Sequence, residues 1–238
     1  MLITLVVANQ KGGVGKTTTA LNLAASLSAA SRKVLLIDLD AQGNSTTGTG
    51  EEKNQKETSL IDVLVDNDSA LEKVIEETRY KFDLIPASTD LISAEIELSS
   101  LPSPTAILKE KLKDLGEAYD YTVIDCPPSL GMLSVSALRA ASKVLIPLQC
   151  EYYSLEGLAS MNKTINEIND ATGEKIEISG ILRTMYDSRI RLSREVSQEL
   201  EEHFSEQLCD TVIPRNVKLA EAPSFGMPAL YYEPEAKG

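Results

Sequence analysis

Short apolar runs alternate along the chain with longer segments that repeat apolar residues at helical spacing. The runs that read as buried strands lie at 2–8, 33–40, 82–86, 121–125, 144–148, 176–182 and 212–213. Helical periodicity follows the first run and recurs at 60–65, 70–77, 91–98, 104–115, 156–168 and 191–204. This alternation predicts an α/β fold, a doubly wound and mostly parallel sheet with helices on both faces.

The segments between these elements have compositions typical of loops. Residues 43–58 are rich in Gly, Ser and Thr and then charged, which predicts a mobile loop, and residues 126–131 contain two prolines and form a loop at a strand end. Ser103-Pro104 predicts a helix start with proline at the first helical position. The chain after residue 213 is expected to be irregular. Because no linker or compositional break occurs, we expect one domain over residues 1–238.

The loop between the first strand and the first helix carries the strongest chemical signal. It reads Asn-Gln-Lys-Gly-Gly-Val-Gly-Lys-Thr-Thr-Thr over residues 9–19. Its glycines let backbone N–H groups face an anion, Lys16 can reach the β- and γ-phosphates of a nucleotide, and the Thr17 hydroxyl can ligate Mg²⁺. The strict pattern G-x-x-x-x-G-K-[ST] fails by one residue, however, because its first glycine falls on Gln10, and Lys11 adds a second lysine.

Three aspartates follow strand runs. Asp38 and Asp40 end the second run, and Asp125 ends the run at 121–125. The carboxyl ends of parallel strands carry the sites of such folds, and a Mg²⁺-nucleotide site needs acidic groups near the γ-phosphate. Each aspartate alone is typical of a structural cap, but two strand ends beside a phosphate loop favour a site.

Composition limits the possible partners. The net charge of −13 over 238 residues opposes nucleic acid, so any DNA contact requires a local basic patch. The three cysteines, Cys126, Cys150 and Cys209, form no C-x-x-C pair, which is typical of reduced thiols in a cytosolic protein. We expect no signal sequence, because the first residues lack a basic region and their apolar run is short, and no run approaches the ~18 apolar residues of a spanning helix.

Several motifs resemble those of one family. KGGVGKTT (11–18) resembles the deviant Walker A motif of the ParA/MinD group of ATPases. Further segments resemble the other motifs of the family and follow in the same order: LLIDLDAQGN (35–44), TVIDCPPSLG (122–131), IPLQCEYYSLEGL (146–158) and VIPRNVKLAEAPSFGMPAL (212–230). These matches span most of the chain and are specific for the chromosome- and plasmid-partitioning branch.

The resemblance implies a role for each matching residue. The nucleotide would be ATP, bound with Mg²⁺ by Lys11, Gly12, Gly13, Val14, Gly15, Lys16, Thr17 and Thr18, with Pro214 and Asn216 beside the adenine. Lys11 would cross a dimer interface to the partner's nucleotide, and Asp40 would position the hydrolytic water. Thr17 would bind the metal directly, and Asp38 and Asp125 through water. Ala41 stands where the family usually has proline, which leaves the hydrolysis rate open.

A local cluster of arginines provides the candidate DNA-binding patch. Between residues 183 and 194 stand Arg183, Arg189, Arg191 and Arg194. The resemblance implies sequence-independent DNA binding by Arg189, Arg191 and Arg194, with Arg215 and Lys218 nearby. The alternative is a solvated helix face, because Arg191 and Glu195 stand four residues apart and can pair.

The function implied by the resemblance is an ATP-driven switch of DNA partitioning in the cytoplasm, on the nucleoid. It would form a homodimer on ATP, bind DNA without sequence preference and be reset by a ParB-type centromere-binding partner. Residues 233–238 stop where relatives usually continue into one more amphipathic helix, and nothing there matches the membrane-targeting helix of the MinD branch.

Alternative functions remain within the same fold. One is a related ATPase that positions another cargo. A second is a redox or metabolic ATPase such as the nitrogenase iron protein, which needs cysteines for an Fe–S cluster. A third is a bacterial tyrosine kinase, for which Tyr231-Tyr232 is the only sign.

Overall fold

The computed structural model describes residues 2–53 and 58–238. Their strands form one sheet in the order β3-β4-β2-β5-β1-β6-β7-β8, in which only the β3–β4 pair is antiparallel. The strands are β1 (Ile3–Val7), β2 (Val34–Asp38), β3 (Glu76–Glu77), β4 (Asp83–Ile85), β5 (Tyr121–Asp125), β6 (Lys143–Gln149), β7 (Glu177–Tyr186) and β8 (Leu208–Pro214). The predicted α/β fold with a mostly parallel sheet is therefore confirmed.

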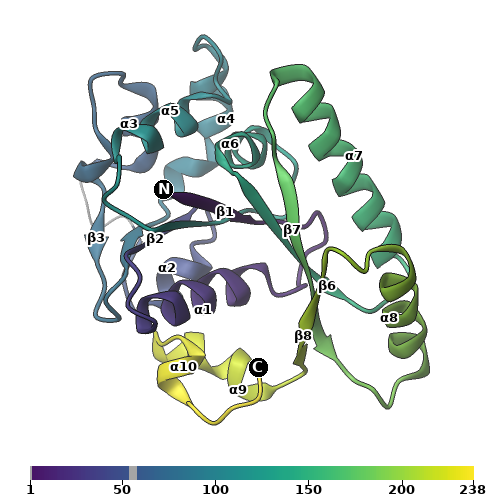
Figure 1. Cartoon of the computed structure of the whole chain (residues 1–238). Helices are drawn as coiled ribbons and strands as arrows, with labels where there is room; N and C mark the ends of the chain where they lie inside the picture. Colours follow the sequence, from purple (N-terminus) through teal and green to yellow (C-terminus); the bar gives the residue numbers. More distant parts are fainter. Residues whose placement is uncertain (1, 54–57) are drawn as a thin grey trace.

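Helices connect the strands and cover both faces of the sheet (Figure 1). The α-helices are α1 (Lys16–Ala29), α2 (Asn44–Gly48), α3 (Leu60–Val65), α4 (Ala94–Ser99), α5 (Ile107–Asp114), α6 (Met132–Ala140), α7 (Ser154–Thr172), α8 (Arg191–His203), α9 (Val217–Glu221) and α10 (Ala229–Tyr232). Short 3-10 turns lie at Leu71–Lys73, Thr89–Ile92 and Ala222–Phe225. No helix of the described residues is both long and apolar enough to cross a bilayer.

The core has two layers because successive residues of each central strand point to opposite faces. On β1, Val6 packs into the larger cluster, with residues of α3 to α8, whereas Val7 packs into the smaller cluster, with residues of α1. β2 alternates in the same way between Leu35 and Leu36. In Figure 1, α1 lies below the sheet with α9 and α10 next to it, and α3 to α7 lie above.

The strand order places the glycine-rich loop at a topological switch point. β1 lies between β5 and β6, and the chain leaves β1 toward β2 on one side but continues from β5 to β6 on the other. The carboxyl ends of β1, β2 and β5 therefore meet at one edge of the sheet, where open α/β folds bind their ligands. The register Asp38↔Asp125 brings two of the predicted site residues side by side there.

Some predicted elements were wrong. Residues 44–48 form α2 within the predicted loop, because buried hydroxyls of this helix find acceptors in the core. Residues 70–77 form a 3-10 turn and β3, since β4 offers an edge for pairing. The prediction at Pro104 also failed: α5 begins at Ile107, after Ser103 turns with φ 51°.

Two regions held helices that the sequence pattern did not reveal. α6 follows the proline loop, and its Ser-rich, weakly periodic sequence hides a buried face formed by Leu133, Ala137 and Leu138. The region expected to be irregular after β8 contains α9, the last 3-10 turn and α10. Elements of four or five residues contain too little sequence for a periodic signal.

Candidate active site

The loop between β1 and α1 is built by glycines with left-handed backbone. Gly13 has φ 73° and Gly15 has φ 89°, conformations that a residue with a side chain adopts only at a cost. Gly15 is also the N-cap of α1, so the free N–H groups of the first helical turn open onto the loop. This local geometry can bind an anion at the positive end of a 14-residue helix.

Side chains from neighbouring strands hold this loop in place. Gln149 Nε2 donates to the carbonyl of Gly13 at 3.1 Å, and the buried Thr184 Oγ1 donates to the carbonyl of Val14 at 2.8 Å. Asn9 Nδ2 donates to the carbonyl of Pro147 at 2.8 Å. Sequence reasoning did not identify Gln149 and Thr184, since their only signal is their position at or near the carboxyl ends of β6 and β7.

Lys16 is folded into its own loop. Only 7% of the residue is exposed, and its Nζ donates to the carbonyl of Lys11 at 3.0 Å. Burial lowers the pKa of Lys16, against the opposing fields of Asp125, Cys126 and Asp40. The ammonium group therefore lies near Asp125 and Asp40, two of the predicted site residues.

Lys11 has the opposite environment. Its ammonium group forms an ion pair with the Glu151 carboxylate, just beyond the end of β6, and 38% of its side chain is exposed. The Lys11 N–H donates to Asn9 Oδ1 at 2.9 Å, which fixes the backbone but leaves the side chain at the surface. The two lysines of the loop thus have separate surroundings.

Asp38 and Asp125 lie side by side and are fully buried. Thr46 donates to Asp38 Oδ2 from its N–H and its hydroxyl, both at 2.8 Å, and Ser45 Oγ donates to Asp125 Oδ2 at 2.8 Å. Burial raises the pKa of Asp38 to about 6, and burial together with the neighbouring Asp38 raises the pKa of Asp125 to about 7. Ser45 and Thr46 are site residues that the sequence reasoning missed.

The surroundings of Asp125 fit a divalent cation. Its Oδ1 is buried without a hydrogen-bond partner in the part of the chain that the structure describes, and the Thr17 hydroxyl lies near the same carboxylate. Within residues 2–53 and 58–238 no group of three or more His, Cys, Asp or Glu residues could hold a metal alone. A cation here would therefore need ligands from a phosphate and from water, as Mg²⁺ commonly has.

Asp40 lies at the rim of this site. It is half-buried, its Oδ1 accepts from the Gln42 N–H at 2.9 Å, and its carbonyl accepts from the Gly43 N–H at 2.7 Å. These bonds close the turn without a proline at 41, and the Ala41 side chain packs against the core. The turn is therefore ordered by hydrogen bonds although the usual proline is absent.

Pro214 and Asn216 end up next to the carboxyl end of β7. Pro214 is the last residue of β8 and pairs with Tyr186. Asn216 is the N-cap of α9: its Oδ1 accepts from the Lys218 N–H at 2.9 Å and its Nδ2 donates to the carbonyl of Lys237 at 2.8 Å. Their predicted position beside the adenine stays a prediction.

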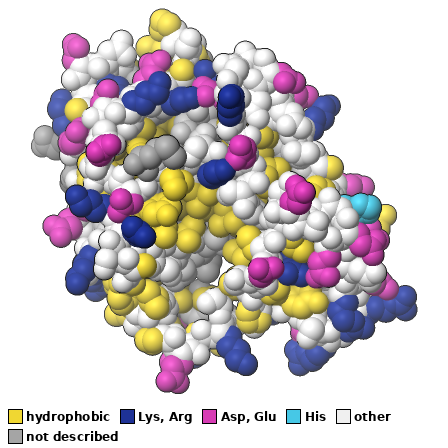
Figure 2. Space-filling model, viewed as in Figure 1, with side chains coloured by type: hydrophobic (Ala, Val, Ile, Leu, Met, Phe, Trp, Pro, Cys, Tyr) yellow, Lys and Arg dark blue, Asp and Glu magenta, His cyan; other side chains and the backbone are white. Residues whose placement is uncertain are grey.

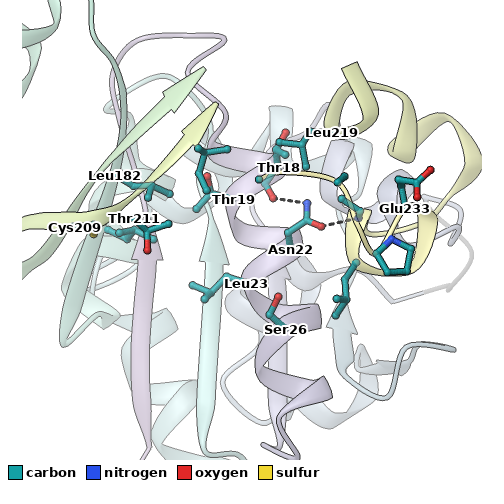
Figure 3. A pocket seen from close by; sticks show the side chains of 17 residues that line it. Thr18, Thr19, Asn22, Leu23, Ser26, Leu182, Cys209, Thr211, Leu219 and Glu233 are labelled. Atoms are coloured by element: carbon teal, nitrogen blue, oxygen red, sulfur yellow. Dashed lines mark hydrogen bonds between the residues drawn. The ribbon is translucent and has the colours of Figure 1, made fainter. Parts of the chain in front are cut away.

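A cavity of about 460 Å³ lies between α1, the strands β6 to β8 and the last helices (Figure 3). Thr18, another predicted nucleotide residue, lines it, and Asn22 bridges the carbonyl of Thr18 at 2.8 Å and the N–H of Ala229 at 2.7 Å. Most of the lining is apolar, including Leu23, Leu182 and Leu219, and neither loop lysine takes part. This cavity is distinct from the phosphate site.

The predicted DNA-binding residues gather around the β7–α8 loop, and most are paired. Figure 2 shows dark-blue side chains at the lower right of the viewed face, where Figure 1 has this loop, with magenta acidic side chains close by. Arg189 contacts both oxygens of Asp187, Arg191 contacts Glu195 at 2.7 Å, Arg194 donates to the carbonyl of Ser188, and Lys218 contacts Glu221 at 3.0 Å. The exposed Arg215 lies close enough to Asp187 to help lower the pKa of that carboxyl.

Arg183 does not belong to this patch, contrary to its place in the arginine cluster of the sequence. It is 8% exposed, pairs with Glu201 at 2.8 Å and donates to Ser197 Oγ at 2.8 Å. It points inward, where Ser197 and Glu201 of α8 accept its hydrogen bonds, whereas Arg189 lies in the exposed loop after β7. The arginine serves to attach α8 to β7.

The cysteines and the tyrosine doublet, on which two of the alternative functions depend, are located as follows in the structure. Cys126 and Cys150 are buried, Cys209 is half-buried, and burial raises the pKa of Cys150 to about 11. The Tyr231 ring stacks on Tyr80 and the Tyr232 ring on Phe225, each with centroids 4.9 Å apart. The tyrosine doublet therefore takes part in packing.

Known proteins resemble the chain along almost its whole length. The model of a family described as an AAA domain matches residues 3–178. The chromosome partitioning protein ParA of Caulobacter vibrioides is 45% identical over 240 residues, which cover 98% of this chain and 88% of that protein. The sporulation initiation inhibitor protein Soj of Bacillus subtilis is 44% identical over 234 residues, covering 98% and 92%.

Solved structures share the fold. The structure of cobyrinic acid a,c-diamide synthase from Mycobacterium smegmatis with bound ADP and magnesium has a TM-score of 0.85 and 36% identity, and the match covers 95% of this chain and 93% of that one. The identity to ParA and Soj is higher and extends over nearly the full length. The chain therefore belongs to the ParA/Soj family of chromosome-partitioning ATPases.

Proposed function

We propose that this protein is an ATP-dependent switch of DNA partitioning that works as a homodimer. ATP hydrolysis as its reaction is supported by family membership, and magnesium use by the ADP and magnesium bound in the similar synthase structure. In this proposal the protein acts in the cytoplasm on the nucleoid, and hydrolysis returns the dimer to monomers that release DNA.

The observation that carries the proposal is the contrast between the two lysines of the loop. Lys16 is buried and bound to the loop itself, so it suits the phosphates of its own subunit's nucleotide. Lys11 lies at the surface, and among the described residues its ammonium group is held only by an exposed ion pair, so this group is available to a neighbour. A surface pair of this kind contributes about 0–1 kcal/mol and is readily exchanged for a phosphate.

The remaining site residues have roles that follow from their positions. The N–H groups of the loop from Gly12 to Thr18 face the phosphates, and Lys16 leaves the Lys11 carbonyl to contact them. Thr17 would bind Mg²⁺, with the carboxylates of Asp38 and Asp125 on its waters. Bound Mg²⁺ supplies charge neutralisation of the phosphates.

Asp40 would orient the attacking water. Its rim position leaves one carboxylate oxygen beyond the Gln42 N–H contact, and it lies near enough to Lys16 to affect that group's pKa. Pro214 and Asn216 would border the adenine. A ParB-type partner would accelerate turnover, and Arg189, Arg191, Arg194, Arg215 and Lys218 would contact DNA phosphates.

Sedimentation of the protein with ADP, ATP or a slowly hydrolysed ATP analogue, with and without plasmid DNA, tests the proposal. We expect monomers with ADP, dimers with the analogue, and DNA binding by dimers only. Lys11→Ala should bind ATP as a monomer, and Asp40→Ala should dimerise without turnover. A monomer with the analogue, or equal DNA binding without nucleotide, would contradict the proposal.

A metabolic ATPase of the same fold is the second candidate, and the similarity to the synthase from Mycobacterium smegmatis favours testing it. The two candidates differ in their DNA dependence. A switch of partitioning binds DNA as its ATP dimer, whereas a synthase turns over its own small substrate and does not bind DNA. The sedimentation experiment with DNA separates them.

A further inference from the structure

A second cluster of cations lies far from the glycine-rich loop, at the end of the sheet where β2 and β4 begin. A hollow of about 450 Å³ there is lined by residues that follow α1 and by the β3–β4 turn. Its cationic residues are Arg32, Lys33, Arg79 and Lys81, and its aromatic residues are Tyr80 and Tyr231. We call these six residues the basic hollow.

Hydrogen bonds hold the walls of the basic hollow together. The hydroxyl of Ser28, the second-last residue of α1, donates to the carbonyls of Tyr80 at 3.2 Å and Lys81 at 2.7 Å. The Tyr80 hydroxyl donates to the carbonyl of Gly226 at 2.6 Å, and Arg79 Nη2 donates to the same carbonyl at 2.7 Å. Three segments distant in sequence thus form one fixed concave surface.

The cations of the basic hollow differ from the predicted DNA residues, most of which have acidic partners. In residues 2–53 and 58–238, no carboxylate lies within 4.0 Å of the charged groups of Arg32, Lys33, Arg79 or Lys81. Asp120 is near, but it accepts the backbone N–H of Lys33 at 2.9 Å. The Arg79 guanidinium lies 5.0 Å above the Tyr80 ring.

Four cations that line one hollow without an acidic partner within 4.0 Å among the described residues are unexpected on a chain of net charge −13. Glu51 lies near enough for its charge to add to the effect of burial, which raises the pKa of Tyr80 most. The mutual repulsion of the four cations is unfavourable unless an anion joins them. The negative end of α1 attracts cations and accounts for part of the cluster, but Arg79 and Lys81 come from a different element. The hollow therefore has the charge of an anion site rather than that of a solvated surface.

We propose that the basic hollow contacts the phosphate backbone of DNA and extends the DNA-binding face of the dimer. The proposal rests on the proposed function. An open surface that combines cations with an exposed aromatic ring is typical of nucleic-acid contacts. Tyr231 is 41% exposed, and the next residue, Tyr232, has Lys218 above its ring at 5.7 Å. Lys218, one of the residues predicted to bind DNA, therefore lies against the sequence neighbour of a residue that lines the basic hollow.

The test uses the double variant Arg32→Gln/Lys81→Gln, because both side chains are exposed. The control is Lys163→Gln/Lys175→Gln, which makes the same change in net charge at the exposed side of α7 and just after it. Binding of a labelled random-sequence duplex to the full chain with a slowly hydrolysed ATP analogue is followed by fluorescence anisotropy from low to moderate salt. Sedimentation verifies that both variants still dimerise.

We expect the hollow variant to bind DNA at least about tenfold more weakly than the control at low salt. The slope of log affinity against log salt should become shallower by about 0.9 for each phosphate that the variant no longer neutralises. If the unchanged protein binds DNA but the hollow variant matches the control, this inference is wrong and the proposed function stands. If the unchanged protein binds no DNA, the proposed function fails first.

A small phosphate ligand is the other possible source of the same chemistry. It would appear as thermal stabilisation by inorganic phosphate, measured in the Lys16→Ala background to exclude the nucleotide site, and abolished in the hollow variant. That result combined with unchanged DNA affinity would overturn the inference.

Discussion

At the scale of single residues, Glu151 positions the Lys11 ammonium group within the single subunit. Its carboxylate pairs with the Lys11 ammonium within one subunit, and 51% of the Glu151 side chain is exposed. Any contact between Lys11 and a partner's nucleotide must first break this pair. The ion pair therefore competes with dimerisation by an amount limited to what surface pairs contribute, about 0–1 kcal/mol.

We predict that Glu151→Gln strengthens the ATP-dependent dimer up to about fivefold per pair, since it removes this competition. The dissociation constant of the dimer is measured by sedimentation with a slowly hydrolysed analogue. Glu156→Gln, an exposed acid on α7, makes the same charge change and serves as control. Equal dimer affinity in the two variants would show that the ion pair has no effect on assembly.

The paired carboxylates make stability depend on pH. The pKa values of Asp38 and Asp125, about 6 and about 7, exceed the value near 3.9 of an unfolded aspartate. Between about pH 4 and pH 7 the folded state therefore binds more protons than the unfolded state, so stability falls as pH rises through this window. A bound cation would favour the ionised forms and oppose this loss.

We accordingly predict that the nucleotide-free protein melts several degrees lower at pH 8 than at pH 5.5, and that Mg²⁺ with ADP reduces the difference. Asp125→Asn should lose most of this pH dependence, because the amide does not ionise. Asp114→Asn, on the exposed end of α5, should keep it. The melting temperature of each variant is measured by thermal unfolding at both pH values. If Asp125→Asn keeps the full pH dependence, the carboxylate pair is not its cause.

At the scale of elements, α2 is a helix formed by its polar side chains. Thr46 Oγ1 donates to Asp38 and accepts from the Ala87 N–H at 2.9 Å, so one hydroxyl joins α2, β2 and the segment after β4. The residue is fully buried. A segment rich in Gly, Ser and Thr resembles a loop in composition, and only these tertiary contacts make it helical.

We predict that Thr46→Val lowers the free energy of unfolding by about 1–3 kcal/mol, because the Ala87 N–H is then buried without a partner. Thr46→Ser retains the hydroxyl and should cost less. Urea unfolding of both variants measures the difference. If Thr46→Val and Thr46→Ser lose equal free energy of unfolding, the hydroxyl is not the group that holds α2 in place.

The same contrast explains how much of the fold followed from the sequence. The central strands were predictable because β1, β2 and β5 are buried on both faces and therefore read as continuous apolar runs. The loop lysines and strand-end aspartates were predictable from residue type and spacing. Ser45, Thr46, Gln149 and Thr184 were not, since their roles depend on strand order and on partners as far as 170 positions away. The inward direction of Arg183 likewise needed the register of β7.

At the scale of the whole molecule, the net charge of −13 opposes every DNA contact, so the local balance near the β7–α8 loop matters. Asp187 holds Arg189 through both carboxylate oxygens, and the Arg189 hydrogen bonds are the main reason that the pKa of Asp187 falls to about 2. At neutral pH the ion pair between Asp187 and Arg189 is therefore formed, and a DNA phosphate must displace the carboxylate to reach the guanidinium. If the protein binds DNA as proposed, the acid weakens that binding and leaves room for the nucleotide state to control it.

We predict that Asp187→Asn binds random-sequence DNA several-fold more tightly at low salt with the ATP analogue, because the asparagine can still accept the Arg189 N–H but no longer neutralises the side chain. Asp170→Asn, on the exposed side of α7, changes the net charge equally and is the control. Fluorescence anisotropy across a salt series separates local from overall charge. If both variants gain affinity equally, the field of the whole molecule governs binding, and neither this loop nor the pairing of its arginine has a special part in it. If only Asp187→Asn gains, the loop is a contact point, and the acid next to its arginine limits how long the dimer stays on DNA.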